Sequence, residues 1–149
     1  MAWRIGGVWW DQSPAPALER LSDTEAEIIA SIADAMFPGD GVFPGGNEVD
    51  VVSFFDHYLS SIAPETARLL RLLLHAIDDM GAVADLALTR FRNRTREERI
   101  AILRAWDNSL FFGRRGAFRG VKLVIATAYC EHPAVLRAAG IEFDCGGVA

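Results

Sequence analysis

The sequence has few of the residues and motifs that carry chemistry. Only two cysteines and three histidines occur among its 149 residues, and two cysteines are too few for a disulfide framework. It contains no Gly-x-Ser-x-Gly elbow, no Walker loop and no His-Glu-x-x-His pair, which are signatures of common hydrolases, nucleotide-binding proteins and zinc proteases. The Glu-x-x-His pair that a ferritin-like di-iron bundle needs is also absent. These absences favour a chain that is not catalytic by itself.

Two further absences exclude whole classes of protein. Acidic residues outnumber basic ones, and the net charge is −5. This argues against a nucleic-acid-binding protein, which needs a basic face that neutralises phosphates. No run approaches the roughly 20 apolar residues of a transmembrane helix. The first residues contain neither an apolar core of signal length nor a twin-arginine pair. We therefore expect a soluble cytoplasmic protein, or a periplasmic one if a leader has been removed.

Apolar and aromatic residues, in contrast, are abundant. They make up 51% of the chain and include nine Phe and four Trp. A domain of this length can bury roughly 68–70% of its unfolded surface, so it needs no disulfides for stability. The composition predicts one globular domain with more apolar surface than a small core can hide, which favours a binding partner.

The periodicity of the apolar residues predicts an all-α domain of about six helices at 22–143, preceded by an extended aromatic arm at 1–21 and followed by a tail at 144–149. Capping residues and prolines indicate helix starts at Ser22 with Glu25, Asp50, Pro64, Thr95 with Glu98, and Pro133. The helices are expected to end near Phe37, Ile62, Met80, Gly113 and Gly140, with a short helix at 82–91 and a nearly uncharged one at 116–130.

Large aromatic residues also lie outside the predicted helices. Trp3, Trp9 and Trp10 belong to the arm, where glycines and prolines argue against a helix. The arm either folds back onto its own domain or inserts into another protein, and tryptophan is enriched at interface hot spots. The Gly-rich loop at 37–49 holds Phe43, which either plugs the core or covers a site on a partner.

A dense basic cluster spans the start of the helix expected at 116–130 and consists of Arg114, Arg115, Arg119 and Lys122. Four positive charges within nine residues could meet an acidic patch or a phosphate. The alternative is the solvated start of a helix.

Cys130, His132 and Cys145 are the candidates for a metal site. They could supply three ligands, but zinc normally uses four protein ligands, or three and a water, at more regular spacing. Two ordinary thiols are the simpler expectation, and a disulfide would need an oxidising compartment.

The other two histidines are predicted at the surface. His57 follows Asp56 on the polar face of its helix, and adjacent helical residues do not face each other, so the two do not form an acid–base pair. His75 has Arg71 four residues before it and Asp79 four residues after it. This spacing predicts a surface charge network.

Four stretches have the character of a known family. They are the first helix ending in Phe37-Pro38, the Gly-rich loop into Val51-Val52-Ser53-Phe54-Phe55-Asp56, the Arg-Thr-Arg-Glu-Glu-Arg segment at 94–99 leading to Leu103 and Trp106, and the Tyr129…Pro133…Gly140-Ile141 ending. Together they resemble the small-subunit family named for gluconate 2-dehydrogenase subunit 3, over about residues 20–143. These motifs are diffuse and helical, and they do not form a catalytic fingerprint.

The resemblance implies a non-catalytic accessory subunit. Members of that family accompany large flavoproteins of the glucose–methanol–choline oxidoreductase group, which oxidise sugars, polyols or alcohols. The large subunit carries the FAD and the catalytic residues, while the small subunit supports its folding and often carries a twin-arginine leader, which is not visible here. We therefore expect this chain to form a hetero-oligomer with the flavoprotein and to have no cofactor, metal or catalytic residue of its own. It neither binds nucleic acid nor inserts into a membrane.

Such an obligate subunit should expose aromatic and arginine anchors. The residues expected to contact the partner are Trp3, Trp9, Trp10, Phe43, Arg114 and Arg115. The alternative function is an autonomous helical interaction or regulatory domain without a flavoprotein partner.

Overall fold

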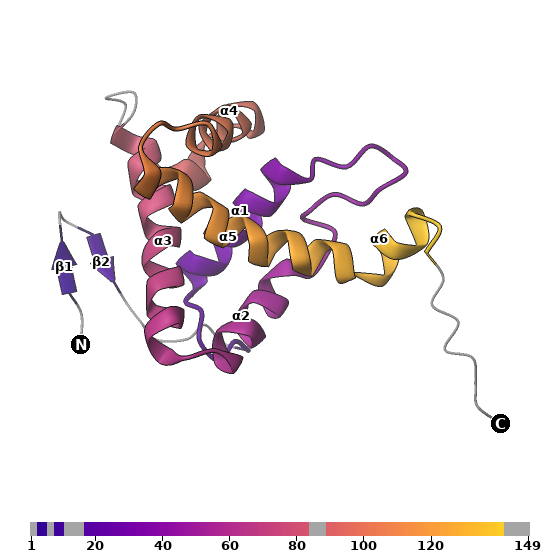
Figure 1. Ribbon diagram of the computed structural model, residues 1–149, viewed down its shortest axis with the longest axis horizontal. Helices are drawn as coiled ribbons and strands as arrows, with labels where there is room; N and C mark the ends of the chain where they lie inside the picture. The colour runs from indigo at the N-terminus through magenta and orange to yellow at the C-terminus, as the bar shows by residue number, and fades with distance from the viewer. Residues whose placement is uncertain (1–2, 6–7, 11–16, 84–88, 142–149) are drawn as a thin grey trace.

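A computed structural model describes residues 3–5, 8–10, 17–83 and 89–141, with side chains at 17–79 and 89–141. Its helices are α1 (Asp23–Met36), α2 (Val51–Ser61), α3 (Pro64–Val83), the 3-10 helix η1 (Phe91–Asn93), α4 (Arg96–Asp107), α5 (Phe112–Glu131) and α6 (Pro133–Ala138) (Figure 1). Strands β1 (Trp3–Ile5) and β2 (Val8–Trp10) precede them and pair antiparallel. The helices confirm the predicted all-α domain.

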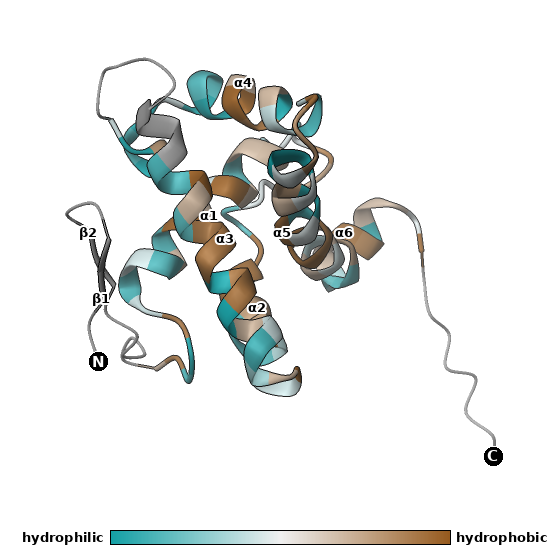
Figure 2. Ribbon diagram, turned by 60° about the vertical axis from the view of Figure 1, so that its left-hand side comes forward, coloured by the Kyte–Doolittle hydropathy of each residue, from teal (hydrophilic) through white to brown (hydrophobic). Residues whose placement is uncertain are grey.

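Helices α1 and α5 organise the domain, because each packs against α2, α3 and α4. The helices α2 and α4 lie on opposite sides of the helical domain, α4 at the top and α2 at the bottom of Figure 1. Apolar stretches of α1 and α3 lie in the middle (Figure 2). The fully buried side chains come from every long helix, and the largest include Ile28, Ile32, Phe55, Leu74, Ile77, Trp106 and Ile125. None of the described helices is both long and apolar enough to cross a membrane.

The predicted capping boxes at Ser22 and Thr95 are both confirmed. The Ser22 amide donates to the Glu25 carboxylate at 2.9 Å, and the Glu25 amide donates back to the Ser22 hydroxyl at 3.3 Å. Thr95 and Glu98 form the same reciprocal pair at 2.9 and 3.3 Å. Since both partners are three residues apart, the sequence alone sufficed to place these two helix starts.

Three helix boundaries differ from the prediction. Helix α3 continues past Met80 to Val83, and the only helical turn in the described part of 89–95 is η1. Helix α4 ends at Asp107 and not near Gly113, while α5 begins at Phe112, four residues before the predicted start. Residues 84–88, within the short helix expected at 82–91, and the tail lie outside the described residues.

The prediction that His75 lies at the surface is wrong. His75 is 7% exposed, and its Nε2 atom lies 3.3 Å from the Glu25 carboxylate. That carboxylate comes from α1, 50 residues earlier in the chain, so the helical spacing around His75 could not reveal it. His57, in contrast, is exposed as predicted.

Asp56 was also placed wrongly on a polar face, because the structure buries it. Its carboxylate accepts hydrogen bonds from the backbone amides of Glu19, Arg20 and Leu21 at 2.8, 2.9 and 2.8 Å. The side chain therefore ties the segment that enters α1 to the middle of α2. A carboxylate that satisfies several backbone N–H groups is structural in role.

Glu25 forms the main buried ion pair between α1 and α3. Only 1% of the residue is exposed, and Arg71 binds its carboxylate through Nε and Nη2 at 2.8 and 2.9 Å. Burial by itself would raise the pKa of Glu25, but hydrogen bonds from His75, Arg71 and Ser22 outweigh it and lower the pKa to about 2. Glu25 is therefore ionised at neutral pH and holds the two helices together.

Candidate partner-binding site

Three consecutive large apolar side chains lie where the connection from α4 enters α5, whose first residue is Phe112. Leu110 is 99% exposed, Phe111 73% and Phe112 76%. We call Leu110–Phe112 the apolar turn. It holds the three most exposed large apolar side chains of the described residues. Because single exposed apolar residues are ordinary but contiguous patches mark interaction sites, the turn is the main candidate for a partner-binding site.

The backbone around the apolar turn is held by local hydrogen bonds. The Asn108 side chain donates to the carbonyl of Arg104 at 3.0 Å, which ends α4. The Phe111 amide donates to the Ser109 hydroxyl at 3.2 Å, and Arg115 donates through Nη1 to the Ser109 carbonyl at 3.0 Å. The turn is therefore ordered before any partner binds, which lowers the entropic cost of association.

Arg115, predicted as a partner contact, has a structural task at this site. Besides its bond to Ser109, its guanidinium lies 5.9 Å from the centre of the Phe112 ring. Both contacts join the Arg115 side chain, on α5, to residues in or next to the apolar turn. We therefore assign Arg115 to holding the turn, and its contact with a partner stays a prediction.

The rest of the basic cluster divides into paired and unpaired cations. Lys122 and Arg119 both bind the Asp107 carboxylate, at 2.7 and 3.5 Å, and the hydrogen bond from Lys122 is the main cause that lowers the pKa of Asp107. The Arg114 guanidinium instead stacks 4.9 Å from the centre of the Trp106 ring. Arg114 makes no hydrogen bond or ion pair to any residue that the structure describes.

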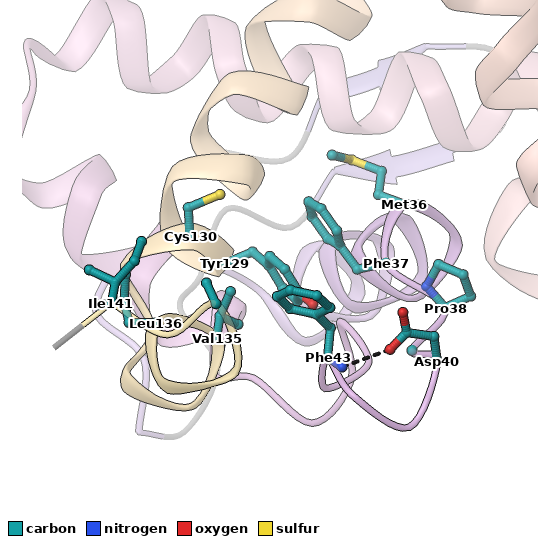
Figure 3. A pocket seen from close by; sticks show the side chains of 12 residues that line it. Met36, Phe37, Pro38, Asp40, Phe43, Tyr129, Cys130, Val135, Leu136 and Ile141 are labelled. Atoms are coloured by element: carbon teal, nitrogen blue, oxygen red, sulfur yellow. Dashed lines mark hydrogen bonds between the residues drawn. The ribbon is translucent and has the colours of Figure 1, made fainter.

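Phe43 lines an apolar groove, of about 480 Å³, between the 37–49 loop and α6 (Figure 3). Its side chain is half-buried and packs against the core. Next to it, the rings of Phe37 and Tyr129 stack with centres 3.8 Å apart, and the Tyr129 hydroxyl donates to the carbonyl of Pro44 at 2.7 Å. Phe43 thus serves the core in part, and its remaining exposed surface faces the groove. No observation tests its contact with a partner.

The three tryptophans of the arm lie in the paired strands β1 and β2. Trp3 is opposite Trp10, and Arg4 is opposite Trp9. The side chains of the arm lie outside the described residues, so the prediction that these tryptophans contact a partner stays open.

The metal hypothesis receives no support from the part of the chain that is described. His132 caps α6, because its Nδ1 accepts a hydrogen bond from the Ala134 amide at 3.3 Å. Cys130 is exposed, and Cys145 lies outside the described residues. Within residues 17–79 and 89–141, no three His, Cys, Asp or Glu side chains are grouped as a metal site requires.

The apolar turn was missed at the sequence level. The helix that begins at Thr95 was expected to continue to near Gly113 and so to include Leu110, Phe111 and Phe112, whereas α4 ends at Asp107. Two signals could have corrected this. Asn-Ser at 108–109 favours a helix end, and Leu-Phe-Phe at successive positions cannot share one face of a helix.

The chain belongs to the gluconate 2-dehydrogenase subunit 3 family, whose model matches residues 23–146. The match covers the six α-helices and the apolar turn, and it confirms the resemblance inferred from the sequence. No curated protein and no solved structure matches the chain.

Proposed function

We propose that this chain is the non-catalytic accessory subunit of an FAD-dependent oxidoreductase of the glucose–methanol–choline group that acts on sugars, polyols or alcohols. The family name describes one subunit of a dehydrogenase, which is consistent with a small chain beside a larger catalytic one. On this proposal, the partner binds FAD and provides the catalytic residues.

The observation that carries the proposal is the exposure of the apolar turn. Its three side chains are each at least 73% exposed, and burying a large apolar side chain gains about 1.5–3 kcal/mol. Leaving three of them in water is therefore unfavourable unless a partner covers them. Aromatic side chains on an ordered backbone are typical hot spots of protein interfaces.

The buried acids support a structural chain. Each of them binds groups of its own chain and so holds helices or loops together. Glu25 binds Arg71, and Asp34 binds Arg96 and Arg99. Asp56 accepts hydrogen bonds from three backbone amides, and Asp78 accepts one from the Arg92 amide. A general acid or base needs a carboxyl group that faces its substrate. These carboxylates instead face cations and amides of their own chain.

Affinity purification of the tagged full-length chain from its native cells tests the proposal. We expect a near-stoichiometric larger partner with the visible absorption bands of a flavin. A lone, colourless monomer would refute the accessory-subunit function. A colourless protein partner would instead support an autonomous interaction domain.

The apolar turn is tested in the same purification by replacing Phe111 and Phe112 together with Ala. The flavin recovered per tagged chain should fall at least about tenfold, because truncating hot-spot aromatics costs 2 kcal/mol or more. Val42→Ala is the matched control, since Val42 is 67% exposed in a different loop, and it should leave the recovery unchanged. Full recovery by the double variant would exclude the turn from the interface.

A further inference from the structure

Arg114 differs from every other cation of the basic cluster. Arg115 donates to the Ser109 carbonyl, and Arg119 and Lys122 bind Asp107. Arg114 alone has no acceptor among the residues that the structure describes. The other cations of the cluster each have an acceptor within their own chain, and Arg114 is the one whose guanidinium has none among the described residues.

The surroundings of Arg114 make this unmatched charge unfavourable in the isolated chain. The side chain is half-buried, and its Nε atom is buried without a hydrogen-bond partner. The guanidinium lies over the face of Trp106, which holds it in one place through a cation–π contact. Leaving a buried donor unpaired is costly, more so for a charged group, so an acceptor that another molecule offered to the rest of the guanidinium would stabilise this arrangement.

We propose that Arg114 is the charged anchor of the partner interface and binds an Asp or Glu side chain of the flavoprotein subunit. This inference rests on the proposed function, and it adds the charge that the partner must present. Arginine presents a planar fork of donors that matches a carboxylate in two hydrogen bonds. The unpaired guanidinium of Arg114 thus specifies an acidic partner residue.

The position of Arg114 next to the apolar turn strengthens the pair. Arg114 lies in the first turn of α5, three residues after Phe111 of the apolar turn, and residues three apart on a helix are neighbours. When a partner covers the turn, it excludes water from the neighbouring guanidinium, and an ion pair is stronger in the lower dielectric that results. The partner surface is therefore an apolar depression for the turn with a carboxylate at its edge.

Arg114→Gln, Arg114→Lys and the control Arg119→Gln test this inference in the full-length tagged chain. Arg119 lies on the same helix, and its side chain is 63% exposed, so its replacement removes an equal charge at an exposed position. The measurement is the flavin absorbance recovered per tagged chain in washes of increasing salt. Thermal unfolding of each isolated variant is measured alongside.

We expect Arg114→Gln to weaken the complex by about 30-fold or more, as loss of one partner of a buried charge pair does. Arg114→Lys should weaken it less, because the charge remains while the planar fork is lost. Arg119→Gln should stay within about twofold of the wild type, as expected for an exposed pair. Wild-type recovery by Arg114→Gln overturns the inference.

Two readouts separate the possible failures. If the wild-type chain brings no flavoprotein, the proposed function fails and the inference fails with it. If the wild type does and Arg114→Gln does so equally, only the inference fails. If Arg114→Gln unfolds, Arg114→Lys decides: binding equal to the wild type at every salt concentration refutes a forked ion pair, and weaker binding with unchanged thermal stability supports it.

Discussion

Replacing Glu25 with Gln tests the ion pair at the centre of the helical domain. The substitution keeps the size of the side chain and one acceptor oxygen but removes the negative charge. Arg71, whose side chain is 13% exposed, would then hold a largely buried charge without its partner. Removing one member of a buried ion pair costs about 3–5 kcal/mol, so Glu25→Gln should lower the free energy of unfolding by that amount.

The pKa of Glu25 gives a separate estimate of the same quantity. Its pKa falls from the usual 4.5 to about 2 in the folded chain. One pKa unit corresponds to about 1.36 kcal/mol, so ionised Glu25 contributes about 3 kcal/mol. Because the folded pKa lies below the unfolded one, this contribution is fully present above pH 4.5 and is lost as the pH falls to about 2.

Urea unfolding, followed by circular dichroism, measures both effects. The difference between wild type and Glu25→Gln should be about 3 kcal/mol near pH 7 and less than half of that near pH 3. Glu27→Gln is the control, because the Glu27 side chain is 67% exposed and 3.7 Å from Arg92, and it should cost less than about 1 kcal/mol. A Glu25→Gln variant within about 1 kcal/mol of the wild type near pH 7 would refute the reasoning.

The remaining predictions concern two glycines and the arm. Gly46→Ala should lower the free energy of unfolding by more than about 2 kcal/mol, because the new Cβ would clash with the backbone carbonyl of Ala33; a smaller loss would show that the 37–49 loop can move away. Gly116→Ala is the contrasting case, since its Cβ meets nothing within 4 Å, and in urea unfolding it should stabilise α5 by roughly 0.5–1 kcal/mol. Replacing Trp9 and Trp10 together with Ala should weaken the complex in the flavin purification, and normal recovery would mean that the arm is not an anchor.

Features that depend on neighbours in the chain were predictable from the sequence. The capping boxes at Ser22 and Thr95 involve residues three apart, so their geometry follows from the helix itself. The start of α6 at Pro133 is local for the same reason. The family resemblance rested on such local motifs, and the family match bears it out.

The site could be predicted only in part. The basic cluster was visible as a run of charges, but which cation lacks a partner depends on Asp107, Ser109 and Trp106. The apolar turn was hidden because α4 ends six residues before the expected position. Whether a Leu or Phe near a helix end is buried depends on the direction in which the chain continues into the next helix. The spacing of apolar residues in the sequence does not contain that information.

The sequence by itself determined the helical class and most helix starts, because these follow from spacings of three or four residues. It also indicated the family, because the motifs that carry the resemblance are local in the chain. The tertiary structure decided which polar groups are buried and which apolar groups are exposed. Asp56 and His75 occupy positions where solvent was expected, and they are buried because acceptors and donors 35 to 50 residues away meet them. Leu110 is 99% exposed, because none of the described helices packs over it. Burial depends on contacts between distant segments, and only the packing of the helices brings those segments together.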